Sequence, residues 1–435
     1  MSHCIRKTLD IKDENITFDE NYLTEEKYRN VLALVFNGTL APKTPNSCPK
    51  CGIININYTI IKHGSKTTNT LMPRVSNRLA ILRLKKQRFL CKSCNKTFTP
   101  LTDVVKFNHT ISKNSIRSAV LGLKEKSSIV DIAYKHDISH STLNNLLNSL
   151  SSQFIVNKTY LPPHLSFDEF KSVKGINANM SFIFTDSSTR VLDIVQNRQL
   201  GHLKSYFFSY SAEARNRVQT ICIDMYAPYI ELIKSCFPKA KIITDRFHVV
   251  QLINRSLNSS RIQTMKDYKP MYARLKRYWK LILKPNENLD SLNYKSFVCF
   301  KYKMTELEVV NELLRIDKEF ENTYWYYQEF VRNFRRKNIN RCISLIHNPR
   351  DRISSSMEKT VKTLNKYEES ISNALIYPYS NGVVEGTNNL IKVIKRIAFG
   401  YRNYDNFRAR ILRISNTLVL LKTTLKKAVI LKMTT

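Results

Sequence analysis

The chain is 435 residues long, and 43% of its residues are hydrophobic. This length and composition exclude a single small domain, so we expect a soluble protein of roughly two to four folded domains. The 70 lysine and arginine residues outnumber the 35 aspartate and glutamate residues, and only a polyanionic partner readily explains the net charge of +35. Single basic runs usually mark solvated faces, but residues 61–100 hold ten cations and no acid. Nucleic acid is therefore the expected partner.

The ends of the sequence show no membrane signal. Residues 1–18 lack the apolar core of a signal peptide, and no stretch of about 18 apolar residues occurs in the sequence. The apolar run 415–433 is interrupted by lysines, which predicts an amphipathic closing helix. We expect a cytoplasmic, nucleoid-associated protein with no membrane partner. Residues 1–45, with seven acids between positions 10 and 26, are predicted to form an N-terminal arm.

Two C-x-x-C pairs, Cys48 with Cys51 and Cys91 with Cys94, predict a zinc site. Four thiolates complete the tetrahedral shell of a structural Zn²⁺. In a reducing compartment the remaining cysteines are not a disulfide framework, and we interpret them as buried small hydrophobic residues. These are Cys4, Cys222, Cys236, Cys299 and Cys342.

The two pairs place the zinc-binding module at residues 46–104. Within it, the partly alternating segment 79–90 is predicted to be a strand that leads into the second pair. The basic side of this strand, which includes Lys85 and Lys86, is expected to contact DNA phosphates.

Residues 105–155 are predicted to form a helix-turn-helix DNA-binding domain. A first helix is expected at residues 112–126. From residue 129 onward the apolar spacing lets two further short helices cross, and Ser139 or Ser141 can cap the later helix of this pair. Asp137 stands in the turn, where aspartate accepts left-handed geometry. The second helix presents polar groups suited to base edges in the major groove. These are Ser141, Asn144, Asn145 and Asn148. A helical hairpin with no role in DNA binding is the alternative.

After Pro162 and Pro163 the pattern changes to strands. Strand-like runs at 164–170, 180–184 and 190–196 precede a helix near 202–210, a strand at 218–224, a helix at 228–236 and a strand at 241–244. This β-β-β-α-β-α-β order is that of the RNase H fold, in which the first and fourth strands of a mixed sheet are neighbours. We therefore predict a multidomain α/β protein with the first part of a catalytic core at residues 160–255.

The predicted strand order brings Asp168 and Asp224 together. Cleavage and transfer of a phosphodiester require a nucleophilic oxygen to attack in line while charge on the leaving oxygen is neutralised, and two Mg²⁺ ions achieve both. Carboxylates are the hard oxygen ligands that such ions need. A lone aspartate at a strand end is usually a turn or capping residue, but here two acids fall at the matching strands.

Glu385 is the predicted third metal ligand. It lies near the start of a helix that opens after Ser380, with Lys392, Lys395 and Arg396 following on the same side and apolar residues on the other. That side would present an acid to metal and cations to DNA. Residues 376–435 are expected to complete the catalytic core and to add C-terminal helices.

The long separation between Asp224 and Glu385 predicts an insertion in the core. Residues 256–375 look all-α, are basic and aromatic, and hold both tryptophans, Trp279 and Trp325. Rings beside basic patches suit distorted DNA ends, where an unpaired base can stack on them. The alternative is that the rings form the helical core of the insertion.

The whole order of motifs resembles the ISL-three family of bacterial insertion-sequence transposases, over residues from about 46 to 420. It is carried by the two C-x-x-C pairs, the helix-turn-helix, Ser166-Phe-Asp-Glu-Phe, Ile223-Asp-Met-Tyr, Asp245-Arg-Phe-His, Asn381-Gly-Val-Val-Glu-Gly-Thr-Asn-Asn and Gly400-Tyr-Arg-Asn-Tyr.

The resemblance implies a DDE transposase that binds the terminal inverted repeats of its element, nicks the ends and joins the 3′ hydroxyls to target DNA. It implies the triad Asp168, Asp224 and Glu385 with Mg²⁺ or Mn²⁺, double-stranded DNA as the partner, and a homodimer or higher oligomer on DNA. Asp245 and His248 match a D-x-x-H signature whose role is either structural pairing or chemistry.

Two other functional classes compete with a transposase. A sequence-specific DNA-binding protein derived from a transposase would have lost a catalytic acid, and all three acids are present. An RNase H-like nuclease would keep the acids but would not need two DNA-recognition modules.

Overall fold

The computed structural model describes residues 2–42, 44–152, 156–174, 176, 178–187, 191–350 and 352–415. The chain divides into two compact units: residues 1–155 with 392–435, and residues 156–391. No helix among the described residues is long and apolar enough to cross a membrane. The closing helix predicted for residues 415–433 lies, beyond Ser415, outside the described residues.

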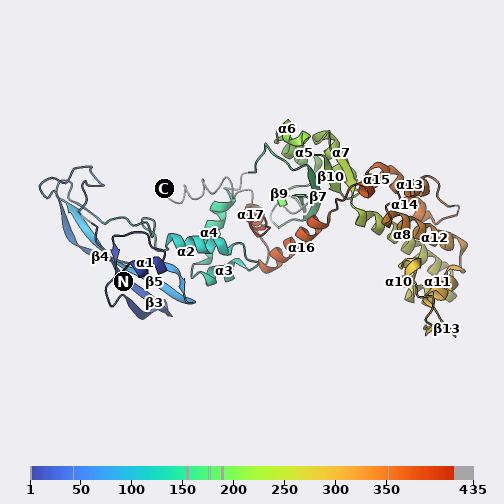
Figure 1. Ribbon diagram of the computed structural model, residues 1–435, viewed down its shortest axis with the longest axis horizontal. Helices are drawn as coiled ribbons and strands as arrows, with labels where there is room; N and C mark the ends of the chain where they lie inside the picture. The colour runs from blue at the N-terminus through green and yellow to red at the C-terminus, as the bar shows by residue number, and fades with distance from the viewer. Residues whose placement is uncertain are drawn as a thin grey trace. The chain divides into compact units, whose positions relative to one another are not determined.

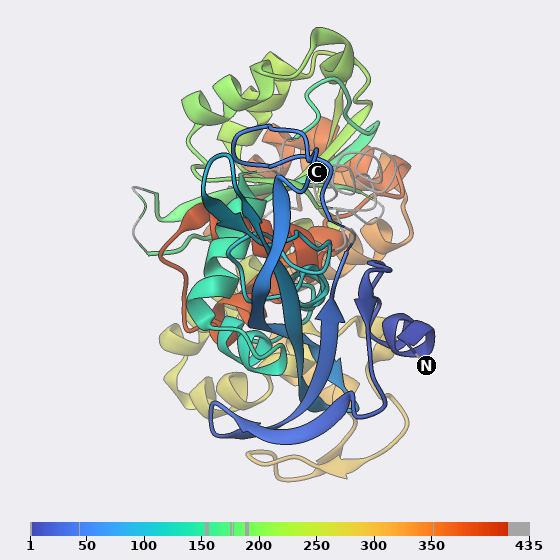
Figure 2. The same cartoon turned by 90° about the vertical axis from the view of Figure 1, so that its left-hand side faces the viewer.

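A six-stranded sheet forms the first part of the first unit, and its longer strands are the long blue arrows of Figure 2. The strand order is β1-β3-β5-β4, with β2 pairing β3 and β6 pairing β5; β3 and β5 are parallel and the other pairs antiparallel. The elements are α1 (Ser2–Thr8), β1 (Ile16–Thr17), β2 (Leu23–Tyr28), β3 (Val31–Leu40), β4 (Ile60–Val75), β5 (Arg78–Cys91) and β6 (Lys96–Phe98).

The strand predicted over residues 79–90 is β5, at the centre of this sheet. Its apolar residues are buried together with residues of β3, including Leu34 and Phe36. Because β1, β2 and β3 belong to the same sheet as β5, the predicted boundary at residue 45 falls inside one structural layer.

A helical cluster completes the first unit. It contains α2 (Lys113–Gly122), α3 (Ile129–Lys135), α4 (His140–Ser151) and α17 (Tyr404–Ile414). Ser139 caps α4 by accepting from the N–H of Thr142, as predicted, and Asp137 has the left-handed φ of +54° expected in the turn. Ile132, Ala133 and Leu143 form the buried contact between α3 and α4.

The C-terminal helix α17 packs into this cluster. The fully buried Arg410 donates hydrogen bonds to the carbonyl oxygens of Leu123, Glu125 and Ser127, and Arg413 donates to that of Val120. Residues 376–435 were predicted to complete the catalytic core and to add C-terminal helices, and these buried arginines hold one such helix, α17, in the first unit.

The second unit contains a five-stranded mixed sheet of order β11-β10-β7-β8-β9. Figure 1 labels three of its strands, β7, β9 and β10. The parallel pairs are β7–β10 and β10–β11, and the antiparallel pairs are β7–β8 and β8–β9. The prediction that the first and fourth strands are neighbours is confirmed. The elements are β7 (His164–Lys171), β8 (Met180–Asp186), β9 (Val191–Val195), α5 (Leu200–Phe208), α6 (Ala212–Asn216), β10 (Thr220–Ile223), α7 (Ala227–Cys236) and β11 (Lys241–Thr244).

Helices cover both faces of this sheet. Ile221 and Ile223 of β10 are buried with residues of α5 and α7, such as Phe207 and Leu232. The intervening Cys222 faces the other way and packs with Ala374 of α15. This alternation follows from the period of two of a strand and fixes which residues lie between the sheet and each helical layer.

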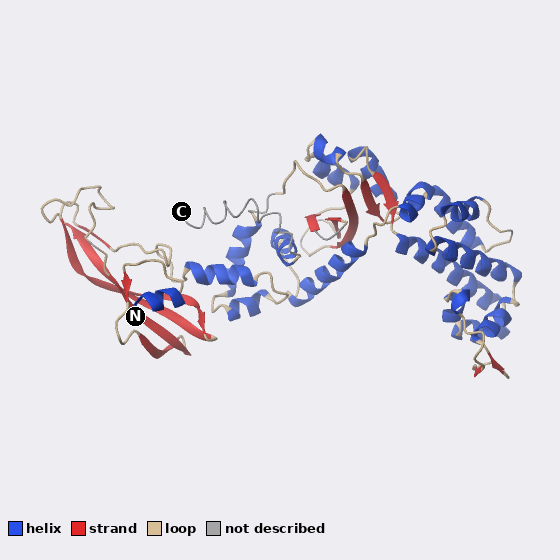
Figure 3. Ribbon diagram, in the orientation of Figure 1, coloured by secondary structure: helices blue, strands red, loops and turns tan. Residues whose placement is uncertain are grey.

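Between β11 and the last helices lies a predominantly helical segment, which Figure 3 shows in blue. Its elements are α8 (Arg246–Asp267), η1 (Lys269–Met271), α9 (Tyr272–Arg277), α10 (Trp279–Leu283), η2 (Asn286–Asn288), β12 (Lys295–Ser296), β13 (Lys303–Met304), α11 (Glu306–Leu314), α12 (Lys318–Arg335), α13 (Ile339–His347), α14 (Ser355–Lys366), α15 (Glu368–Ile376) and α16 (Gly382–Ile397). The prediction of an all-α insertion was wrong in one detail, since β12 and β13 pair as a two-stranded sheet.

The aromatic residues of this segment mainly form its core. Phe320, Tyr324, Tyr326 and Phe330 of α12 are fully buried in one cluster with residues of α8, α11 and α14. This supports the interpretation of the rings as core residues. Of the five other cysteines, Cys222, Cys236 and Cys342 are buried as predicted, but Cys4 and Cys299 are exposed because both lie on surface segments.

Candidate active site and zinc centre

Three aspartates lie level on three neighbouring strands of the second unit. In the parallel register, Thr220 pairs with His164 and with Lys241, offsets of 56 and 21 residues. Continued along the strands, the same offsets place Asp224 beside Asp168 and Asp245 beside Asp224. Neighbouring strands lie about 4.8 Å apart, so this register sets Asp224 between Asp168 on one side and Asp245 on the other.

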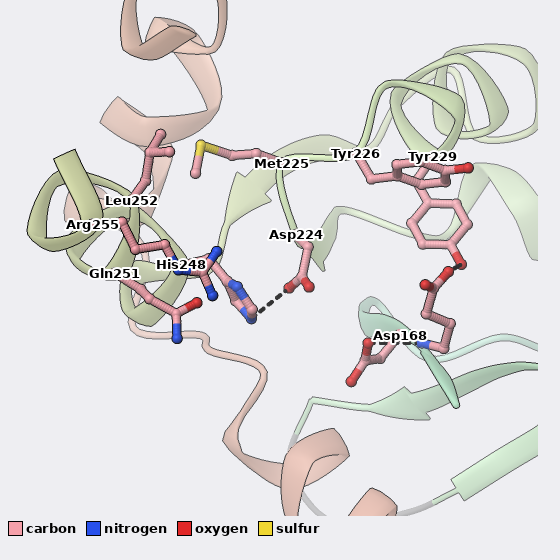
Figure 4. Close-up of a pocket in the computed structure, with 10 residues that line it drawn as sticks. Asp168, Asp224, Met225, Tyr226, Tyr229, His248, Gln251, Leu252 and Arg255 are labelled. Atoms are coloured by element: carbon pink, nitrogen blue, oxygen red, sulfur yellow. Dashed lines mark hydrogen bonds and ion pairs between the residues drawn. The ribbon is translucent and has the colours of Figure 1, made fainter. Parts of the chain in front are cut away.

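His248 joins this row from the first turn of α8. Its Nε2 lies 3.0 Å from Oδ1 of Asp224 (Figure 4). The same atom lies 4.0 Å from Oδ2 of Asp245, which is 3% exposed. Asp245 lies between the end of β11 and the start of α8, so the junction of this strand and helix fixes the positions of Asp245 and His248. Each of Asp224, Asp245 and His248 offers a ligand atom within 4.8 Å of the others, a spacing that suits one metal ion.

The start of α16 is fixed against the same row by asparagines. Asn381, 1% exposed, donates from its backbone N–H to Oδ1 of Asp245 at 3.3 Å and from Nδ2 to the carbonyl of Phe167 at 3.2 Å. Asn388 donates from Nδ2 to Oδ2 of Asp168 at 2.7 Å.

Glu385 lies on the face of α16 that carries these asparagines. Spacings of four and three residues place Asn381, Glu385 and Asn388 on one side of a helix. Glu385 is half-buried there, but it does not line the acidic pocket and does not belong to the ligand group of Asp224, Asp245 and His248. The structure thus brings Asp168 and Asp224 into one pocket and places Glu385 on the adjoining helix face.

Burial raises the pKa values of Asp168 and Asp224 and so disfavours their ionised forms. Burial raises the pKa of Asp168 to about 7, the N–H of Glu169 opposes this, and the nearby Asp224 adds to the rise. Burial also raises the pKa of Asp224, although His248 acts in the opposite direction. Carboxylates in this state favour a divalent cation, which removes their repulsion.

The pocket around the acids has a volume of about 280 Å³ and also contains groups that attract anions. Arg255, Gln251 and His248 line it from one side of α8, at spacings of three and four residues (Figure 4). A guanidinium beside carboxylates suits a phosphate that lies between the arginine and a metal ion.

The four predicted zinc ligands converge in the first unit. The sulfur atoms of Cys48 and Cys94 are 3.8 Å apart, as are those of Cys51 and Cys91, and all four lie within 4.8 Å of one another. Zn–S bonds of about 2.3 Å in a tetrahedron give sulfur separations of about 3.8 Å, so the site fits Zn²⁺.

Local backbone geometry prepares the first cysteine pair for metal. Gly52 has a φ of +76°, which closes the turn so that its N–H reaches the carbonyl of Cys48 at 2.9 Å. Burial acts to raise the pKa of Cys48, but the N–H groups of Lys50 and Cys51 donate to its sulfur and bring the pKa down to about 7. The N–H of Ile53 acts to lower the pKa of Cys51, but burial and the neighbouring thiols raise it to about 12. Cys48 is therefore the member of this pair whose thiolate is favoured before metal binds.

The predicted DNA-contacting residues have different surroundings. On α4, Ser141, Asn145 and Asn148 are exposed, and the half-buried Asn144 donates to the ring of His140. On β5, Lys85 is exposed, and burial with the nearby Lys66 lowers the pKa of Lys86. On α16, Lys392 and Arg396 are exposed, whereas the ammonium of Lys395 lies 5.4 Å from the ring centre of Phe407.

Sequence reasoning missed the residues that orient the acids. Glu169 accepts from Tyr229 at 3.0 Å and pairs with Arg198, and these contacts depend on β7, α7 and the residues before α5 meeting in space. Asn381 lies inside the quoted helix-start segment, yet no local pattern shows that it faces Asp245. Arg255 could have been found from its spacing, because a residue seven positions after His248 lies on the same side of a helix.

Comparisons with known proteins agree with this geometry. A family model described as a transposase of the ISL3 type matches residues 165–411, and a model described as the zinc-finger of transposase IS204/IS1001/IS1096/IS1165 matches residues 44–94. The zinc-finger match covers all four cysteines of the metal site. The transposase match covers more than half of the chain and includes Asp168, Asp224, Asp245 and Glu385.

Two curated proteins are similar to parts of the chain. The transposase for insertion sequence element IS1001 of Bordetella parapertussis is 25% identical over 255 residues, which are 57% of this chain and 60% of that protein. A protein named ATP-dependent protease from Lactococcus lactis subsp. lactis is 31% identical over 138 residues, 32% of this chain and 43% of that protein. The chain thus spans less than two thirds of either relative.

The family matches follow the domain order of the chain. A zinc-ribbon module with its Cys4 cluster precedes a mixed-sheet core that carries the acids. This chain belongs to the ISL3 family of transposases.

Proposed function

We propose that this protein binds the terminal inverted repeats of an insertion sequence, cleaves DNA strands at the element ends and joins the freed 3′ hydroxyls to target DNA. The observation that carries the proposal is the parallel register of β7 and β10, which pairs Cys222 with Ser166 and, continued two residues further, sets Asp224 beside Asp168. The core is then of the RNase H type, a fold whose first and fourth strands are neighbours. Membership of a transposase family supports the same reaction.

The reaction would depend on Mg²⁺ or Mn²⁺, which supply Lewis-acid stabilisation and a nucleophilic oxygen when bound. Asp168 and Asp224 would hold the ions, with Glu385 as the third ligand and Asp245 as the alternative. Asn388 orients the carboxylate of Asp168, and His248 that of Asp224. Arg255 would bind the non-bridging oxygens of the cut phosphate.

DNA recognition would reside in the first unit. The crossed helices α3 and α4 fit a helix-turn-helix, with the exposed Asn145 and Asn148 of α4 reading bases. Lys85 and Lys86 of the zinc-bearing sheet would contact phosphates, as would Lys392, Lys395 and Arg396 at the end of α16. Because an element has two ends to be joined, we propose that the protein acts as a homodimer or higher oligomer on DNA.

The experiment that tests this function uses the DNA that flanks the gene. Imperfect inverted repeats bracketing the gene supply the duplex, and purified protein with Mn²⁺ should nick it at the repeat boundary and insert it into a plasmid. Cleavage of any duplex without preference would indicate a nuclease instead. Specific binding without any cleavage would indicate a DNA-binding protein.

A proteolytic function, suggested only by the name of one relative, has a weaker basis. The pattern G-x-x-x-x-G-K-[S/T], which cradles ATP phosphates in P-loop enzymes, does not occur in the sequence. The similarity to that relative also covers only 32% of this chain.

A further inference from the structure

A second cavity, of about 610 Å³, lies beside the acidic pocket in the second unit. Tyr226, two residues after Asp224, lines both. The other walls come from residues before β8, residues between β9 and α5, and the first turn of α7. Its volume falls within the roughly 300–1,000 Å³ of small-ligand sites, so the cavity has room for a planar ring system.

The ring of Tyr226 is held by two neighbours and remains accessible. The guanidinium carbon of Arg198 lies over it, 5.5 Å from the ring centre, and Tyr229 packs edge-on at 5.0 Å. Glu169 fixes both neighbours by pairing with Arg198 and accepting from Tyr229. Tyr226 is nevertheless 38% exposed (Figure 4 shows its ring beside Tyr229). An aromatic face at the edge of an active-site pocket is thus available for stacking.

The rim of the cavity carries groups that match the edge of a base. Asn179, Asn197 and Gln199 contribute amides, each of which both donates and accepts. Asn197 and Gln199 hold each other through Nδ2 and Oε1 at 3.0 Å, which orders the rim. Glu231 adds an acceptor that suits an exocyclic amino group. Glu231 also pairs with Lys204, whose Nζ lies 2.8 Å from its Oε1, so this carboxylate is held at the rim.

We propose that this cavity receives an unpaired nucleobase next to the phosphate that is cut at Asp168 and Asp224, with the base stacked on Tyr226. The inference rests on the proposed function, because it assumes that a DNA strand enters the acidic pocket. Stacking on an aromatic ring tolerates every base, and an arginine over the same ring strengthens it. Extruding one nucleotide would also free the adjacent phosphate from the geometry of the duplex.

The test combines a protein variant with a missing base. Tyr226→Ala should lower strand cleavage about 10-fold on an intact end duplex, within the range that loss of one base stack produces. A stable abasic nucleotide, moved in turn through the positions flanking the cut, should cause a similar loss in the wild type at one position. At that position Tyr226→Ala should cause no further loss, and Tyr226→Phe should recover most of the rate on intact DNA.

Tyr160→Ala is the matched control. Tyr160 is also an exposed tyrosine of the second unit with an arginine over its ring, Arg217 at 5.1 Å, but it lines neither the acidic pocket nor this cavity. Equal losses for Tyr226→Ala on intact and abasic DNA at every position would overturn the proposal. Placing the abasic nucleotide in the end duplex or in the target duplex shows which DNA supplies the base.

A photocrosslink separates this proposal from the proposed function. Duplexes with 5-iododeoxyuridine at the same positions, bound in Ca²⁺ and irradiated, should crosslink to the peptide that contains Tyr226. A crosslink without any cleavage in Mn²⁺ would leave the base site standing while the proposed reaction fails. Cleavage in Mn²⁺ with crosslinks only at other peptides would support the proposed reaction and refute the base site at Tyr226.

Discussion

Asn388 of α16 donates a hydrogen bond of 2.7 Å to Asp168 of β7, although 220 residues separate them in the sequence. The same amide lies 3.4 Å from the carbonyl oxygen of Glu169. Nearly two turns earlier, Asn381 contacts Asp245 and Phe167. The helix that carries Glu385 is therefore set against the sheet by two amides, and the orientation of the acids depends on them.

Asn388→Ala should weaken metal binding more than DNA binding. Without the amide, the Asp168 carboxylate loses the group that fixes its orientation, and removal of such supporting groups typically costs about 10- to 100-fold in metal affinity or activity. The measurement is the Mn²⁺ concentration that gives half-maximal cleavage, with end binding followed separately. Asn340→Ala, at an exposed position in α13, is the control. An unchanged Mn²⁺ dependence would show that Asn388 does not position the site.

Cys51→Ser and Cys94→Ser should each release zinc and unfold the zinc-binding end of the first unit. One small buried cluster lies there, formed by Cys48, Ile60, Phe89 and Cys91. Without zinc, the free energy of metal binding no longer stabilises the fold around this cluster. End binding should be lost while the second unit remains folded. Zinc analysis and amide hydrogen exchange measure the two effects, with Cys299→Ser as the control. Purified wild-type protein without zinc would contradict the assignment.

Asn144→Ala and Asn145→Ala test whether α4 reads bases. Removing one side chain that binds a base edge should lower the discrimination between the element end and random DNA by about 1 to 3 kcal/mol. Replacing Lys85 and Lys86 should weaken binding to all DNA and reduce its salt dependence. Titrations at two salt concentrations distinguish the outcomes. If the asparagine variants bind both DNAs more weakly by the same factor, α4 does not determine specificity.

His136 should make the first unit less stable in acid. His136 is half-buried: Nδ1 of its ring lies 3.2 Å from Oγ of Ser118, and a methyl group on Gly122 would approach Nε2 to 2.6 Å. Burial lowers the pKa of His136 below its usual 6.5. The unfolded chain therefore binds a proton first, so the stability that His136 contributes is present above about pH 6.5 and is lost as the pH falls through the lowered pKa.

Thermal unfolding at several pH values tests this expectation. His136→Asn should show a smaller loss of Tm between pH 7.5 and pH 5.5 than the wild type, whereas the exposed His109→Asn should not differ from it. The same pH dependence in His136→Asn and the wild type would assign the acid sensitivity to other groups.

The sequence predicted those features of the fold and the site that a local pattern of residues determines. Runs rich in strand-forming residues predicted β7, β8 and β10, and the strand order of the RNase H fold then predicted that Asp168 and Asp224 are neighbours. The two cysteine pairs predicted one metal site because four thiolates need one ion.

The remaining features depend on contacts between distant segments. No local pattern shows that β3 pairs with β5, which follows the first C-x-x-C pair in the sequence. Nor does one show that the buried Arg410 donates to three carbonyl oxygens between α2 and α3. The same reason hid the contacts of Asn381 and Asn388, because the sequence does not show which residues of the sheet face the start of α16.

Asp168→Ala, Asp224→Ala and Glu385→Ala should each abolish cleavage and strand transfer while end binding persists. Removal of a metal ligand takes away several kcal/mol of transition-state stabilisation, so we expect a rate loss of about 10³-fold or more. Glu213→Ala is a suitable control because its side chain is 84% exposed. Asp193 is not, since it is 2% exposed and accepts a hydrogen bond from Tyr206. Asp245→Ala decides between the two candidates for the third ligand. If Glu385→Ala joins ends at the wild-type rate and Asp245→Ala does not, the metal is held by the row of three aspartates, and α16 serves only to position it.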